Sequence, residues 1–118
     1  MKILLVEPEK RPVVKDIPDT LESIQEIVDG TIQAIYPFED PVALICNDEG
    51  KLLNLPKNRM LPEIGDIICG PFLIVGAPPG RDHFTSLSDE QLQRYQKRFQ
   101  LPEVFLNVDG SVFVLKNL

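Results

Sequence analysis

Several residue types on which protein chemistry often depends are scarce in this sequence. It has no tryptophan, one histidine and two cysteines among its 118 residues. A structural zinc site needs four ligands, which one histidine and two distant cysteines do not supply. The glycine patterns of phosphate-binding loops are missing, since neither GxGxxG nor GxxxxGK[ST] occurs, and no GxSxG nucleophile elbow surrounds a serine. We therefore predict no metal, no cofactor and no catalytic residue.

The two thiols offer little reactive chemistry. Cys46 and Cys69 each lie in an apolar, strand-like run, which is typical of buried and reduced cysteines. The thiol–imidazole pair that we consider is Cys46 with His83. A nucleophilic thiolate needs a polar and electropositive setting, whereas Cys46 ends the run VALIC. We expect an inert Cys46, and His83 in a solvated loop.

Long hydrophobic runs are also missing. No window approaches the roughly 18 apolar residues of a membrane span. The apolar start of the chain, Ile3 to Val6, is too short for a signal peptide. We predict a cytoplasmic protein without membrane contact, folded as a single domain over residues 1–118, which is long enough to bury a core.

Positive charge is in the minority. Lysine and arginine number 12 against 18 acidic residues, which gives a net charge of −6 and an isoelectric point near 4.7. This balance disfavours direct binding to nucleic-acid phosphates. The acids fall in short pairs (Glu39-Asp40, Asp48-Glu49, Asp89-Glu90), which solvated loops and a helix N-terminus explain more simply than mimicry of DNA. An acidic protein-interaction or DNA-mimic inhibitor remains an alternative.

The most apolar stretch is residues 66–77 (DIICGPFLIVGA), and we place it at the centre of the fold. Gly70-Pro71 in its middle predicts two short strands or one bent strand. Gly50 ends a predicted tight turn and is expected to have a positive φ. Further strands are predicted at residues 2–7, 13–17, 31–38 and 42–46, and as a hairpin over 103–116 around Asp109-Gly110.

Two amphipathic helices accompany these strands. For the first, Asp19 is a plausible N-cap with Glu22 three residues later, and Gly30 is the expected C-terminal cap. The second begins at Ser88 with Gln91 completing a capping box. The predicted fold class is therefore α+β, with a mainly antiparallel sheet of about five to seven strands, two helices packed against it and a C-terminal β-hairpin.

Several short segments recur in an order typical of one protein family. They are residues 2–8 (KILLVEP), 20–30, 42–51 (VALICNDEGK), 55–59 (LPKNR), 66–72 and 86–95 (SLSDEQLQRY). Over roughly residues 1–100 the chain thereby resembles a family of small proteins of unknown function, known mainly from phages, conjugative elements and gut Firmicutes. The family has no assigned activity, so the resemblance implies no catalytic residues. It implies an accessory protein of a mobile element, acting against host defence.

The segment Leu55 to Arg59 carries the most informative polar residues. Arginine offers a planar bidentate donor, lysine a point charge and asparagine both a donor and an acceptor, a mixture that suits a phosphate, a carboxylate or an acidic protein surface. The candidate ligand-binding residues are Lys57, Asn58 and Arg59, with Asn47 and Arg81 from neighbouring loops. The alternative is that Arg59 pairs with an acid such as Asp48 or Glu63 and only fixes a loop.

The resulting hypothesis is a non-enzymatic accessory binding protein that sequesters a small anionic, nucleotide-like ligand or binds a host protein. A small hydrolase is a further alternative, and it predicts polar side chains that converge in a cleft around a perturbed acid or thiol.

The C-terminal hairpin contains Phe105 and the run Val112 to Leu115, which are too apolar to stay exposed. We expect them to complete the sheet or to dock on a second copy, as in a homodimer.

Overall fold

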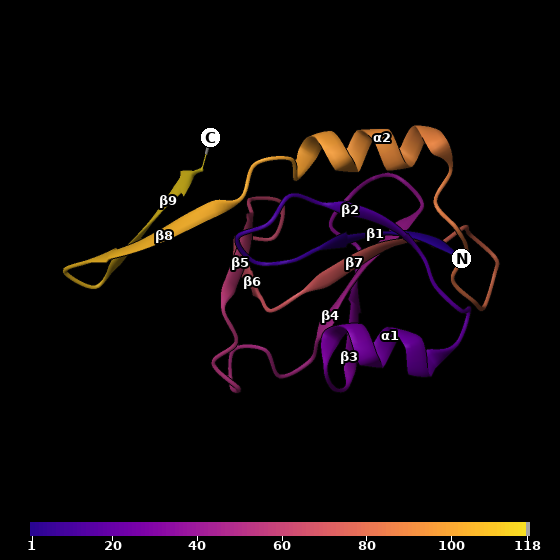
Figure 1. The fold of residues 1–118 in the computed structure, drawn as a ribbon, viewed down its shortest axis with the longest axis horizontal. Helices are drawn as coiled ribbons and strands as arrows, with labels where there is room; N and C mark the ends of the chain where they lie inside the picture. Colours follow the sequence, from indigo (N-terminus) through magenta and orange to yellow (C-terminus); the bar gives the residue numbers. More distant parts are fainter. Residues whose placement is uncertain (118) are drawn as a thin grey trace.

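The computed structural model describes residues 1–117, and within them the chain forms nine strands and two helices (Figure 1). The elements are β1 (Lys2–Val6), β2 (Val13–Asp16), α1 (Leu21–Val28), β3 (Ile32–Ile35), β4 (Val42–Asn47), β5 (Lys57–Leu61), β6 (Asp66–Cys69), β7 (Phe72–Gly76), α2 (Asp89–Arg98), β8 (Glu103–Val108) and β9 (Ser111–Lys116). The predicted α+β class is confirmed.

The main sheet has five strands in the order β2-β1-β7-β4-β3, and every neighbouring pair is antiparallel. The apolar run 66–77 divides at Gly70-Pro71, as predicted, into β6 and β7. Only β7 occupies the centre of the sheet, where all five of its residues are buried. Strand β6 leaves the sheet and pairs with β5 in a separate hairpin.

Both faces of the sheet are apolar, and each is covered by one helix (Figure 1). On β1, Leu4 and Val6 contribute to the core beneath α2, whereas Ile3 and Leu5 contribute to the core beneath α1. This alternation follows from the two-residue period of a strand. Because successive residues of a central strand face opposite sides of the sheet and both sides are buried, nearly every residue of these strands is apolar.

The helix ends agree with the sequence for α2 and differ for α1. The Ser88 side chain caps α2 in a full capping box with Gln91, as predicted. The prediction of Asp19 as the cap of α1 is wrong, because Thr20 Oγ1 accepts the hydrogen bond from the Ser23 amide at 3.2 Å. The left-handed residue at its other end is Asp29, with φ of 58°, rather than Gly30.

The region between β4 and β6 differs most from expectation. Gly50 has no positive φ; its hydrogen is needed because a Cβ there would lie 2.6 Å from the carbonyl oxygen of Cys69. No strand was predicted over residues 57–61, yet β5 forms there. Its polar residues Asn58 and Arg59 point inward, so the usual alternation of apolar and polar residues is missing.

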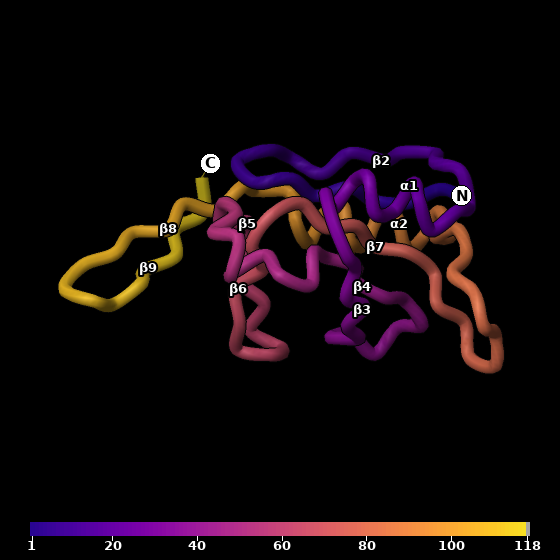
Figure 2. The backbone as a smooth tube through the Cα atoms, turned by 90° about the horizontal axis from the view of Figure 1, so that it is seen from below, coloured from indigo at the N-terminus to yellow at the C-terminus, as the bar shows by residue number. Residues whose placement is uncertain are grey.

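The predicted C-terminal hairpin is confirmed, with β8 and β9 paired from Glu103↔Lys116 to Val108↔Ser111. It does not join the main sheet. Both views show it standing away from the rest of the molecule (Figures 1 and 2). The molecule is therefore elongated, with extents of 46 × 28 × 22 Å.

Candidate functional site

The predicted segment 57–59 lies at the start of β5, and its three side chains have different surroundings. Lys57 is exposed, whereas Asn58 and Arg59 are fully buried. Asn58 Nδ2 donates to the carbonyl oxygens of Val6 and Gly70, each at 2.9 Å. Asn58 therefore joins the end of β1 to the β6–β7 connection.

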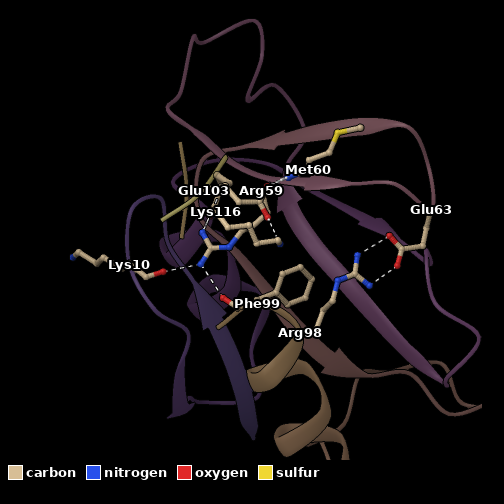
Figure 3. A network of polar contacts seen from close by, with 9 residues as sticks. Lys10, Arg59, Met60, Glu63, Arg98, Phe99, Glu103 and Lys116 are labelled. Carbon is tan, nitrogen blue, oxygen red and sulfur yellow. Dashed lines mark hydrogen bonds and ion pairs between the residues drawn. The ribbon is translucent and has the colours of Figure 1, made fainter. Parts of the chain in front are cut away.

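The Arg59 guanidinium lies where three parts of the chain converge (Figure 3). Nη2 donates to the carbonyl oxygens of Lys10, at 2.8 Å, and Phe99, at 2.9 Å, while Nη1 donates to Asn58 Oδ1 at 2.9 Å. The prediction that Arg59 pairs with an acid is wrong, because main-chain and amide oxygens take that place. Glu63 instead binds Arg98 through two N–O contacts of 2.5 and 2.8 Å.

The positive charge of Arg59 is stabilised by the nearby Glu103 carboxylate without a direct ion pair within residues 1–117. Burial lowers the pKa of its guanidinium, and the nearby Glu103 carboxylate opposes that shift. Glu103 is itself buried; it accepts from the Met60 amide at 2.9 Å and pairs with Lys116 at 3.1 Å. Arg59 Nε has no hydrogen-bond partner within residues 1–117. A ligand would reach Arg59 only if the surrounding segments moved apart.

The remaining predicted residues are distributed over separate places. Asn47 is buried and binds the end of α1, with Nδ2 2.9 Å from the Val28 oxygen and 3.2 Å from the Asp29 oxygen. Arg81 is exposed in the loop between β7 and α2. Lys57, Asn47 and Arg81 line three different clefts, so the five predicted residues do not form one site.

Lys57 lines a cleft of about 530 Å³ between the start of β5 and the base of the C-terminal hairpin. Phe105 and Asn117 supply an aromatic ring and an amide to the same cleft. Two acids, Glu9 and Glu103, also line it, although Glu103 is paired with Lys116. Among the described residues 1–117 that line it, the cleft thus offers one lysine without an ion-pair partner for an anionic group, and a ring for a planar one.

A second polar cleft, of about 650 Å³, lies between α2 and the β3–β4 connection. It was not predicted from the sequence. Asp40 binds both Arg94 and the Tyr95 hydroxyl there, and the Glu63–Arg98 pair lies in the same cleft. The local sequence offers one signal for this cleft, two arginines four residues apart (Arg94 and Arg98) with Tyr95 between them. The Tyr95 hydroxyl and the Arg98 guanidinium hold the pKa values of Asp40 and Glu63 below their usual range.

This second cleft brings polar side chains together, as the hydrolase alternative requires. Its acids, however, are paired with arginines, an arrangement more typical of structural ion pairs than of a catalytic base. A general base works best with a pKa near the operating pH, whereas Tyr95 and Arg94 lower the pKa of Asp40 and Arg98 lowers the pKa of Glu63. Arg94 also contacts Glu90, so it neutralises members of two of the predicted acidic pairs. The arrangement fixes the β3–β4 connection and the β5–β6 turn against α2.

The structure also gives no support for a catalytic pair of Cys46 and His83. Burial raises the pKa of the Cys46 thiol to about 11, so little thiolate forms at neutral pH. His83 is exposed and contacts the carboxylate of its neighbour Asp82 at 3.1 Å. Among residues 1–117, no group of three or more histidine, cysteine or acidic side chains is arranged to hold a metal ion.

Half of the exposed large hydrophobic residues described in residues 1–117 lie on the short C-terminal hairpin. Residues directly opposite in the β8–β9 register share a face, so Val104, Leu106, Val108, Phe113 and Leu115 lie together on one side. Each of these five side chains is between 41% and 53% exposed. We call this set the apolar hairpin face. No charged residue of the segment 103–116 belongs to it.

These features define an α+β domain whose sheet is covered on both sides and which carries an apolar hairpin as an appendage. Residues 1–100 match the family described as "Domain of unknown function (DUF3846)", and the chain belongs to that family. No curated protein and no solved structure matches the chain. The hairpin lies outside the matched range. Over residues 1–117, no helix is long and apolar enough to cross a membrane.

Proposed function

We propose that this protein is a non-enzymatic binding protein that acts through protein–protein contact, with the C-terminal hairpin as its binding element. The observation that carries the proposal is the apolar hairpin face, which leaves five large side chains about half exposed. Exposed apolar patches of this kind mark interaction sites in soluble proteins. Within residues 1–117 the hairpin contacts the rest of the chain mainly at its base, where β8 meets β5, and its apolar face stays open to a partner.

The setting that we propose is an accessory role in a phage or other mobile element. The resemblance to proteins of such elements supports a host protein as a target and counter-defence as the purpose. The free thiols of Cys46 and Cys69 fit a reducing compartment such as the cytoplasm. A second copy of the chain is the other partner that the hairpin suits, and a homodimer is part of the proposal.

Substitution of Phe113 by lysine tests the binding element directly. Phe113 lies in the middle of the apolar hairpin face and is 52% exposed, so Phe113→Lys should leave the fold intact and remove the contact. Tagged wild-type and variant chains are each co-expressed with an untagged copy and also incubated with host lysate. Partners retained by the wild type should be lost from the variant. Identical retention by both chains would contradict the proposal.

A small anionic ligand is the second candidate, and the free Lys57 in its cleft favours it. A ligand that binds only the folded protein must raise its thermal midpoint. We expect mononucleotides, cyclic dinucleotides or nicotinamide-derived nucleotides to raise the midpoint of the wild type. The Lys57→Ala variant should lose that shift, because Lys57 is the exposed cation in the cleft. Absence of a shift with every compound would exclude nucleotides.

A further inference from the structure

We propose that the apolar hairpin face binds the same face of a second copy, giving a two-fold symmetric dimer in which two hairpins stack face to face. This inference rests on the proposed function and names the partner for that binding element. A two-stranded hairpin is marginally stable alone in water and needs a second layer over its apolar side. The hairpin of another copy supplies a layer of matching length and composition.

The charge distribution favours self-association of this face. The chain carries a net charge of −6, which opposes contact between two copies through most of its surface. Within residues 103–116, Glu103 and Lys116 belong to the opposite face and Asp109 lies in the turn. Face-to-face stacking therefore places no charged side chain of residues 103–116 in the layer that the two hairpins share.

The register predicts how two copies align. The pair Leu106↔Phe113 lies midway between the base pair Val104↔Leu115 and the tip pair Val108↔Ser111. A two-fold axis through the middle places Leu106 and Phe113 of one copy over the same residues of the other. The small Ser111 at each tip then lies over the bulkier base pair of the partner hairpin.

The size of the face predicts a weak dimer. Five half-exposed side chains of these types present on the order of 400 Å² per copy. With strand backbone and flanking residues from both copies, the buried area approaches the roughly 1,200 Å² at which specific interfaces begin. We expect a concentration-dependent equilibrium with a dissociation constant in about the micromolar range.

A charge-swap experiment tests this arrangement in the full-length chain. The wild type should approach twice the 13.3 kDa of one chain in light scattering as its concentration rises. Phe113→Lys and Phe113→Glu should each weaken self-association at least about 100-fold, because like charges would meet near the axis. An equal mixture of the two variants should restore the dimer as a mixed pair. The matched control is Val112→Lys, which changes an exposed valine on the opposite face and should leave the dimer intact.

Two results would overturn the inference. One is a wild type that stays monomeric at about 0.5 mM, well above the expected dissociation constant. If hairpin-dependent capture of a different protein persisted in that case, the proposed function would stand and only the second copy would be excluded. The other is loss of association in Val112→Lys to the same degree as in Phe113→Lys. Circular dichroism of each variant shows whether the fold is retained, and recovery in the mixture excludes simple misfolding.

Discussion

Arg59→Ala is expected to lower the free energy of unfolding by about 3–5 kcal/mol, because it removes a fully buried side chain together with the hydrogen bonds that Nη1 and Nη2 donate. The carbonyl oxygens of Lys10 and Phe99 would both lose their donor inside the protein. These contacts join the β1–β2 turn and the end of α2 to β5. Their loss should therefore loosen three elements at once.

Urea denaturation followed by circular dichroism measures this effect, since the chain has no tryptophan for fluorescence. Lys57→Ala is the matched control: it removes an exposed cation two positions away, so stability should change by less than about 0.5 kcal/mol. Arg59→Lys should also destabilise, because an ammonium cannot reach the same oxygens in a planar fork. An Arg59→Ala variant of unchanged stability that had lost a ligand would instead assign Arg59 to binding.

Asn47→Ala is expected to cost about 2–3 kcal/mol, because it leaves buried main-chain groups without partners. Asn47 Nδ2 donates to two carbonyl oxygens at the end of α1, and Oδ1 accepts from the Glu49 amide at 2.7 Å. The amide thus closes the helix and holds the turn after β4. Hydrogen exchange of the α1 amides should accelerate more than that of the central strands.

Asn47→Asp separates the two roles of this side chain. The carboxylate retains the acceptor for Glu49 but loses the donors and adds negative charge at the helix C-terminus, where the dipole disfavours it. We expect it to be at least as destabilising as Asn47→Ala. The control is Gln33→Ala, an exposed amide on the neighbouring strand β3. Equal stability of Asn47→Ala and this control would show that the contacts of Asn47 are dispensable.

Local sequence determined much of the fold. The apolar runs predicted β1, β4 and β7, the capping box placed the start of α2, and Asp109-Gly110 placed the C-terminal hairpin. Each signal acts over a few residues through backbone preference or the period of apolar side chains. Strand β5 was missed because its inward side chains are polar, and a period of apolar residues cannot reveal a buried amide and guanidinium.

The roles of the polar residues were decided by the tertiary structure. The sequence indicated that Lys57, Asn58 and Arg59 were unusual, but their exposure depends on chain segments far along the sequence. Val6, Lys10 and Phe99 provide the oxygens that turn Asn58 and Arg59 inward. The sequence by itself determined the elements and the apolar character of the hairpin. Only the packing of distant segments decided which polar groups are satisfied inside and which apolar face remains uncovered, because both depend on contacts between residues that are remote in the chain.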